Sequence, residues 1–321
     1  MNRVVRWTVT LAVLALLVVF ARRVDWGATW IAIRGASMPL LLLAALINLA
    51  TLGVKGVRWW IFLRPLGARS PWLAMRATAA GAGLNNVLVA NGGDAARVLF
   101  AARSTGLSSA TVLASLALER TFDAVGYVVL LVGSALLLPL PPDLARYRVP
   151  AQVVLAAMVA GLAVLALRAP AAAPTATAAA VAEAAIPRSI GHRARAYLGR
   201  FGRSVAELST PGRFVAALVL SLAAWAGQLA VFALTADAGG ARLSVGGNMA
   251  ALLAVNAGLL IRATPGNVGV FQLTYALAAT RFGMDNATAI AIALLIQTLQ
   301  IVPTTVLGVL LAPEFVLRRA R

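Results

Sequence analysis

Cysteine is absent from this chain of 321 residues, which excludes disulfide bonds and thiolate metal sites. Charge is also scarce, since 12% of residues are charged and 61% are hydrophobic. The only histidine, His192, falls in a polar segment, where a surface position is far more common than a catalytic one. A soluble domain of this length needs far more polar surface, so the composition indicates a polytopic membrane protein.

Acidic residues are few: 10 acidic residues face 28 basic ones, and the net charge is +18. Lys55 is the only lysine, and the other basic residues are arginines. The basic residues lie between apolar runs, as the positive-inside rule requires of a membrane protein. The basic excess therefore does not indicate nucleic acid as a partner.

Six apolar runs are predicted to cross the bilayer. They are 8–21, 38–60, 108–140, 150–168, 213–236 and 286–312. The arginine-rich loop 168–213 and both basic ends of the chain are predicted to be cytoplasmic. Run 8–21 lacks a small-residue cleavage site and is predicted to be a retained signal anchor. We therefore expect a multi-pass protein of the cytoplasmic (inner) membrane.

The topology has one discordant segment. Segment 22–37 carries Arg22, Arg23 and Arg34, yet it must lie outside if the other segments are placed as above. Arg22 and Arg23 can reach the interface with their long side chains.

Two further apolar segments are interrupted by glycine, asparagine, arginine or proline, at 81–97 and at 258–272. Backbone that leaves a helix at membrane depth must be satisfied by protein or by a wet cavity. Paired breaks in two halves are typical of a transport site between inverted repeats. The alternative is an ordinary kinked spanning helix at each place.

The sequence therefore predicts an all-α polytopic membrane protein with about six spanning helices and two re-entrant hairpins. Hairpin 72–103 would enter from the cytoplasm and hairpin 245–282 from outside. Residues 38–140 and 213–312 would form an inverted repeat within one membrane domain, 1–321.

Segment 169–212 is the main polar stretch, and residues 187–209 within it are basic and amphipathic. Such a helix lies on anionic headgroups at the cytoplasmic interface or packs on the base of the protein.

Ionisable residues within apolar segments mark functional paths or buried partners. The first group is Arg58 with Lys55, Arg64 and two tryptophans, which fits an interfacial anchor or a substrate contact.

The first break holds Asn85, Asn86, Asp94 and Arg97. Gly92 and Gly93 precede a helix start that Asp94 can cap, and Arg97 on its first turn would complete an anion seat. The alternative is a capping residue paired locally with its own arginine.

Glu119, Arg120 and Asp123 form a triplet of net charge −1 within an apolar run. Such a triplet needs cations from elsewhere, and Arg58, Arg97 and Arg262 are the candidates. Arg262 precedes the second break, where proline and glycines interrupt the helix and a new helix can begin near Asn267.

These motifs, in this order, resemble the lysylphosphatidylglycerol synthase transmembrane region family, or flippase-like integral membrane proteins. The matching pieces are Arg58-Trp59, Asn85 and Asn86, Gly93-Asp94 with Arg97, Glu119-Arg120 with Asp123, and Pro265-Gly266-Asn267-Val268-Gly269 followed by Phe271-Gln272. The resemblance covers roughly residues 8–316. The chain departs from the family at Gln272, where many members have glutamate, and near Asn91, where members usually have proline.

The resemblance implies a flippase-like module without the soluble aminoacylating domain of the fused enzymes. We expect a transporter of an anionic or headgroup-modified lipid, not an enzyme. The alternatives are an accessory or scaffold subunit for a membrane glycosyltransferase or lipid-modifying enzyme and, less favoured, a lipid-phosphate enzyme. The expected partners are membrane lipids with an anionic or polyprenyl-phosphate headgroup, and a homo-oligomer remains open.

No cofactor and no metal site are expected. The predicted lipid- or anion-binding residues are Arg58, Asn85, Asn86, Asp94, Arg97, Glu119, Arg120, Asp123, Arg262, Pro265, Gly266, Gly269 and Gln272.

Overall fold

The computed structural model describes residues 25–87, 92–137, 149–150, 152–153, 211–260 and 265–311. Over these residues the regular structure is helical, with nine α-helices and three short 3-10 turns. The predicted span 8–21, nearly all of the predicted span 150–168, the amphipathic segment 187–209 and Arg262 lie outside the described residues.

Four helices have the length and composition to cross a membrane. They are α3 (Met38–Leu63), α6 (Ser109–Leu137), α11 (Pro211–Ala238) and α14 (Asn286–Leu311). A bilayer core of about 30 Å needs about 20 helical residues, and each of the four exceeds that number. These helices confirm four of the six predicted spans.

The interrupted segments form two pairs of shorter helices, α4 (Pro71–Val87) with α5 (Gly92–Thr105) and α12 (Val245–Gly258) with α13 (Val270–Ala279). Each of these helices has 17 residues or fewer. The members of each pair pack against each other, so both segments fold as helical hairpins. The chain is helical up to Val87, although the first break was predicted from residue 81.

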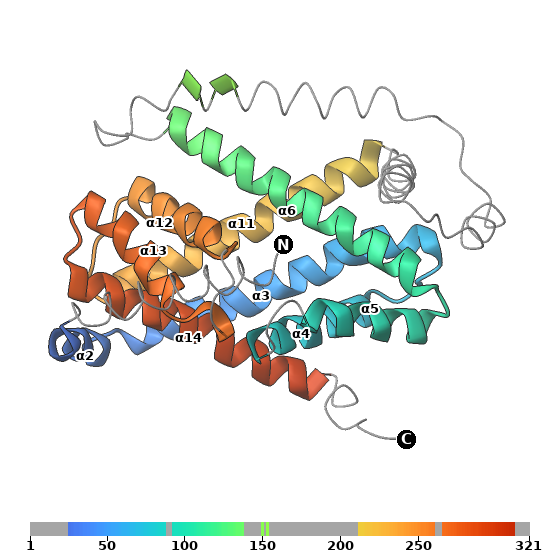
Figure 1. Ribbon diagram of the computed structural model, residues 1–321, viewed down its shortest axis with the longest axis horizontal. Coiled ribbons are helices and arrows are strands. Elements are labelled where there is room, and N and C mark those ends of the chain that lie inside the picture. Colours follow the sequence, from blue (N-terminus) through green and yellow to red (C-terminus); the bar gives the residue numbers. More distant parts are fainter. Residues whose placement is uncertain are drawn as a thin grey trace, which may run out of the picture.

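The long helices bring the two halves of the chain together. Helix α3 packs along α11, and α14 packs along α4, as Figure 1 shows for α14 and the α4–α5 pair. One apolar core joins α11 to α14 and includes Phe232, Phe271 and Tyr275. A second core lies between α3, α5 and α6 around Trp59 and Phe122. The charged residues of the first half adjoin this second core.

Helix α14 contains Pro303, which has no backbone N–H to donate to the carbonyl of Leu299. The side chain of Asn48 on α3 donates to that carbonyl oxygen at 3.1 Å and to Thr304 Oγ1 at 3.3 Å. An unsatisfied carbonyl in an apolar environment is costly, so Asn48 makes the proline tolerable.

Segment 22–37 contains a short helix, α2 (Trp26–Arg34), whose N-cap Asp25 accepts the N–H of Ala28. Trp26, Trp30 and Ile31 are exposed on it, and Arg34 stacks over Trp30 with its guanidinium carbon 4.9 Å from the ring centroid. Exposed tryptophan beside arginine is typical of a membrane interface. A helix in this segment was not predicted from the sequence.

Candidate functional site

Glu119 on α6 is the centre of a buried charged cluster. Its Oε1 lies 3.2 Å from Arg58 Nη2, and its Oε2 lies 2.7 Å from Arg97 Nη2. The side chain of Glu119 is only 4% exposed. One carboxylate from α6 thus holds an arginine from α3 and another from α5, and these pairs confirm that Arg58 and Arg97 neutralise the acidic triplet.

Arg58 is fully buried and has three partners. Besides Glu119, its Nη1 lies 2.7 Å from Asp123 Oδ1 and donates to Ser221 Oγ at 2.9 Å. Its Nε has no hydrogen-bond partner. A sealed guanidinium needs counter-charge to be stable in the protein interior, and two carboxylates supply it.

Arg97 stacks on an aromatic ring. Its guanidinium carbon lies 3.8 Å from the ring centroid of Trp59, and the indole N–H of Trp59 donates to Ser115 Oγ at 3.2 Å. The close contact of Arg97 with Glu119 lacks hydrogen-bond alignment and is therefore an ion pair without a directed bond. Glu119 and Trp59 thus already contact the guanidinium of Arg97, which the sequence predicts to bind an anion. A phosphate that binds this guanidinium must displace Glu119.

The open side of the cluster is formed by Arg120, Asp94 and Asp123. Arg120 Nη2 donates to both carboxylate oxygens of Asp94, at 2.9 and 2.7 Å. Its Nη1 lies 3.9 Å from Asp123 Oδ2. The side chain of Arg120 is 51% exposed and that of Asp123 is 24% exposed, so this part of the cluster is accessible.

The start of α5 is capped by an amide and not by the predicted carboxylate. Asn85 Oδ1 accepts the N–H of Gly93 at 2.9 Å, and Asn85 Nδ2 donates to Asp94 Oδ1 at 3.0 Å. Asp94 is engaged by Asn85 and Arg120, which differs from the predicted capping role. The difference arises because α4 packs closely against α5, which places the side chain of Asn85 on the exposed N–H of Gly93.

The second break is held by uncharged groups. Gln272 Oε1 accepts the N–H of Gly269 at 2.7 Å, and Gln272 Nε2 donates to Gln297 Oε1 at 2.6 Å. Gln297 Nε2 then donates to the carbonyl of Gly266 at 2.8 Å. Helix α13 begins at Val270, three residues after the predicted start at Asn267, because Gly266, Asn267 and Gly269 all have positive φ.

Asn86 lies where the two breaks approach each other. Its Nδ2 donates to Thr305 Oγ1 at 3.2 Å and to the carbonyl of Ile301 at 3.4 Å, both on α14. A Cβ at Gly266 would lie 3.6 Å from the carbonyl oxygen of Asn86. Pro265 begins the short 3-10 turn Pro265–Asn267 that packs near α4.

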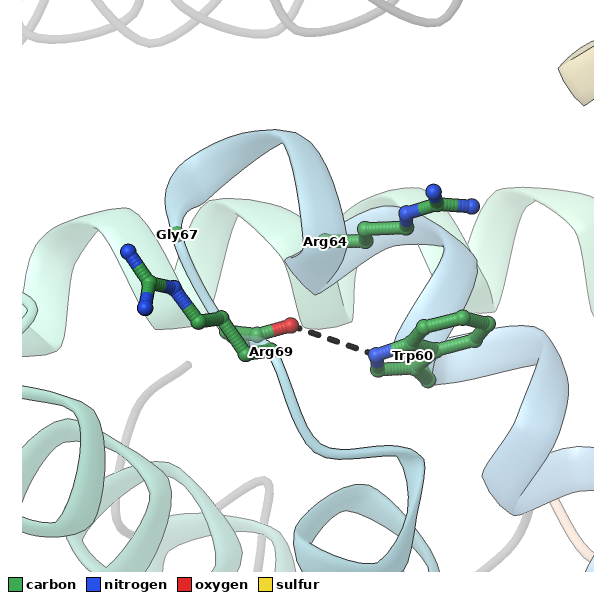
Figure 2. A pocket seen from close by; sticks show the side chains of 5 residues that line it. Trp60, Arg64, Gly67 and Arg69 are labelled. Atoms are coloured by element: carbon green, nitrogen blue, oxygen red, sulfur yellow. Dashed lines mark hydrogen bonds between the residues drawn. The ribbon is translucent and has the colours of Figure 1, made fainter.

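A separate hollow of about 460 Å3 lies at the end of α3, lined by Trp60, Arg64, Gly67, Ala68 and Arg69. Figure 2 shows the two guanidinium groups pointing to opposite sides of it, and the N–H of Trp60 donates to the carbonyl of Ala68 at 3.2 Å. Arg64 stacks over Trp60 with its guanidinium carbon 5.3 Å from the ring centroid. These features suit an interfacial anchor.

Several residues of the charged cluster and of the second break were not predicted from the sequence, notably Ser221, Ser115 and Gln297. Serine and glutamine within apolar runs are common, and only the packing of α11 on α3 and of α14 on α13 identifies them as partners. The one sequence signal for such a partner is a hydroxyl or amide side chain within an apolar run, which can bind a predicted charge on another helix. Among the described residues no group of three or more His, Asp or Glu side chains is placed to bind a metal ion.

The helices and the buried ion pairs define a helical multi-pass membrane protein with a charged cluster inside its first half. Residues 7–308 match the family model described as the lysylphosphatidylglycerol synthase TM region, and the chain belongs to that family. No curated protein matches the chain significantly.

Proposed function

We propose that the protein is a flippase-like transporter that moves an anionic or headgroup-modified lipid across the cytoplasmic membrane. The observation that carries the proposal is the charged cluster of Arg58, Arg97, Glu119, Arg120 and Asp123 within apolar helices. Ionisable residues inside membrane segments are costly and typically line the paths of polar substrates. A cluster that is sealed at Arg58 and open at Arg120 offers a polar surface to a headgroup while the acyl chains stay in the bilayer.

The arrangement of the helices supports an inverted repeat as the frame of this transporter. Helices α3, α4, α5 and α6 correspond in order to α11, α12, α13 and α14, and corresponding neighbours pack in both halves. The contact of α4 with α14 has its counterpart in the contact of α12 with α6. Helices α5, α12 and α13, with 14, 14 and 10 residues, are too short to span a bilayer alone, which supports re-entrant hairpins.

The transport proposal predicts scrambling of labelled lipids in proteoliposomes. The purified full-length protein should accelerate the exchange of fluorescent phosphatidylglycerol between leaflets, compared with protein-free vesicles of the same composition. Glu119→Gln should reduce this rate because it unbalances the charged cluster, whereas Arg281→Gln, an exposed arginine outside it, should not. Failure of the wild-type protein to scramble any bacterial lipid would refute the proposal and favour the accessory-subunit role.

The proposed orientation has its own test, since the chain has no cysteine and single cysteines can be introduced cleanly. Ser104 and Arg242 are exposed and lie at the bases of the first and second hairpins. With cytoplasmic termini, Ser104→Cys should react with an impermeant maleimide from the cytoplasmic side, and Arg242→Cys from outside. Labelling of both from the same side would refute the inverted repeat.

A further inference from the structure

Helix α14 is divided between the two halves of the molecule. Its first part, up to Leu299, packs into the apolar core that it shares with α11, α12 and α13. Its last part packs on α4, where a Cβ at Gly308 would lie 2.6 Å from the carbonyl oxygen of Ala79. Figure 1 shows α14 running from α2 to α4, and Pro303 lies between its two parts. Sharp bends in helices occur most often at proline, so this boundary is the place where α14 bends most easily.

Two asparagines from other helices bridge Pro303. The first is Asn48 on α3, which donates to the carbonyl oxygen of Leu299 at 3.1 Å and to Thr304 Oγ1 at 3.3 Å. The carbonyl precedes the proline, and the hydroxyl follows it. One amide group of α3 thus joins both parts of α14.

The second asparagine is Asn86, near the end of α4. Its Nδ2 donates to the carbonyl oxygen of Ile301 at 3.4 Å and to Thr305 Oγ1 at 3.2 Å, again on either side of Pro303. We call Asn48 and Asn86 the asparagine clamps. Side chains of neighbouring helices compensate the backbone bonds that a proline removes in a membrane helix. Here they also oppose a bend, because each clamp ties the two parts of α14 together at a fixed spacing.

The two parts of α14 hold different breaks of the chain. Before Pro303, Gln297 Nε2 donates to the carbonyl oxygen of Gly266 in the second break at 2.8 Å. After it, the carbonyl oxygen of Leu311 accepts a hydrogen bond from Arg76 Nε on α4 at 2.6 Å. The last part of α14 is therefore fixed to the first hairpin, and the first part to the second break. A bend at Pro303 changes the position of one break relative to the other.

We propose that Pro303 is a hinge, and that release of the asparagine clamps moves the α4–α5 hairpin relative to the second half of the chain. Such a hinge is independent of the lipid that is proposed as substrate, and it would serve any cargo that passes between the two breaks. Residues 304–311 extend roughly 12 Å along the helix axis. A bend of about 20–30° at Pro303 therefore displaces the end of α14 by about 4–6 Å.

Distances between spin labels test the hinge, and labels can be placed freely because the chain has no cysteine. Leu310 at the end of α14 is paired with Leu113 near the start of α6 or with Val215 near the start of α11, and all three side chains are exposed. In the full-length protein in detergent, each pair should give one main distance. Replacement of both clamps, Asn48→Leu with Asn86→Leu, should add a second population, displaced by about 4–6 Å in at least one pair. Each single variant keeps one clamp and should show a smaller second population.

The rescue and the control use the same label pairs. Pro303→Ala in the double variant restores a backbone N–H and should remove the second population. Asn256→Leu should leave both distances unchanged, because the amide of Asn256 donates to the carbonyl oxygen of Leu252 on its own helix at 2.8 Å. A second population that persists after Pro303→Ala would overturn the proline as the axis of movement.

Thermal unfolding of the same variants separates a hinge from a purely structural role. Loss of the clamps should lower the unfolding temperature in either case. A lower unfolding temperature with unchanged distances in both label pairs would overturn the hinge and leave Asn48 and Asn86 as structural supports. These measurements use no lipid substrate, so a hinge in a protein that does not scramble lipids would refute the transport proposal alone. Scrambling by a protein whose clamp variants show no second population would refute the hinge alone.

Discussion

The substitution Glu119→Gln tests the charged cluster most directly, because one carboxylate serves two buried arginines. The change keeps the shape of the side chain and removes its charge. Arg58 retains Asp123 at 2.7 Å, but Arg97 loses the only carboxylate within 4.0 Å of it among the described residues. The side chain of Arg97 is 5% exposed, so water cannot replace the lost partner.

The expected loss of unfolding free energy is about 3–5 kcal/mol, the typical result of leaving one partner of a buried ion pair unpaired. The stacking of Arg97 on Trp59 is present in both proteins and does not enter this difference. Asp123→Asn should cost about 1–3 kcal/mol, because Arg58 then keeps Glu119 and the lost carboxylate is partly exposed. Arg281→Gln should change stability by less than about 0.5 kcal/mol.

Unfolding in mixed micelles of a mild detergent and sodium dodecyl sulfate, followed by tryptophan fluorescence, measures these differences. The double variant Glu119→Gln/Arg97→Met should be more stable than the sum of the single losses indicates, because it removes the unpaired charge as well. A Glu119→Gln protein that unfolds with the wild-type midpoint would refute the reasoning, as would strict additivity of the two substitutions.

Three further predictions concern the packing and the caps. Gly93→Ala should unfold at a lower temperature than the wild type, because the new Cβ would overlap the carbonyl oxygen of Gly81. Gly133→Ala is the control and should be neutral or slightly stabilising, because a Cβ at that position has nothing within 4 Å. Equal unfolding temperatures of the two variants would contradict the close contact of α4 and α5. Asn48→Leu should lower the free energy of unfolding by about 1–3 kcal/mol, because it leaves the carbonyl of Leu299 without a hydrogen bond. Adding Pro303→Ala should reduce this loss, because alanine restores the helical N–H. An equal loss in the double variant would contradict this account. Hydrogen bonds from Thr288 hold the pKa of Asp285 below its ordinary value of 3.8, so this cap should stabilise α14 above that pH and lose its effect as the pH falls through the lower, folded-state pKa. Asp285→Ala should therefore cost about 0.5–1 kcal/mol near neutral pH, and less in acid; a cost that is independent of pH would contradict the assignment.

The long helices were predictable because a run of about 20 apolar residues has few other stable structures. The pairing of the acidic triplet with Arg58 and Arg97 was predictable because unpaired charge is costly in an apolar region. The partners within reach depend on packing between distant segments, which no local pattern records. Asn85 therefore caps α5 in place of Asp94, and Gln297 binds the second break, although neither role was predicted.

Helix α2 was missed for a different reason. It has nine residues, and its apolar face is exposed, so it lacks the length and the buried stripe that identify a helix in a sequence. The side of the membrane on which it lies stays a prediction, as do the roles of the predicted site residues in lipid binding.

The way in which α6 is attached distinguishes it from its neighbours. Helices α4 and α14 meet at their backbones, where a Cβ at Gly308 would lie 2.6 Å from the carbonyl oxygen of Ala79. Helix α6 contacts α3 and α5 through side chains, namely the apolar core around Phe122 and the ion pairs of Glu119 with Arg58 and Arg97 and of Arg120 with Asp94. Helices that touch at their backbones cannot shift past each other without a clash. Long charged side chains can change rotamer and exchange ion-pair partners. An anion that competes for one of these arginines therefore also weakens the attachment of α6 to α3 or α5.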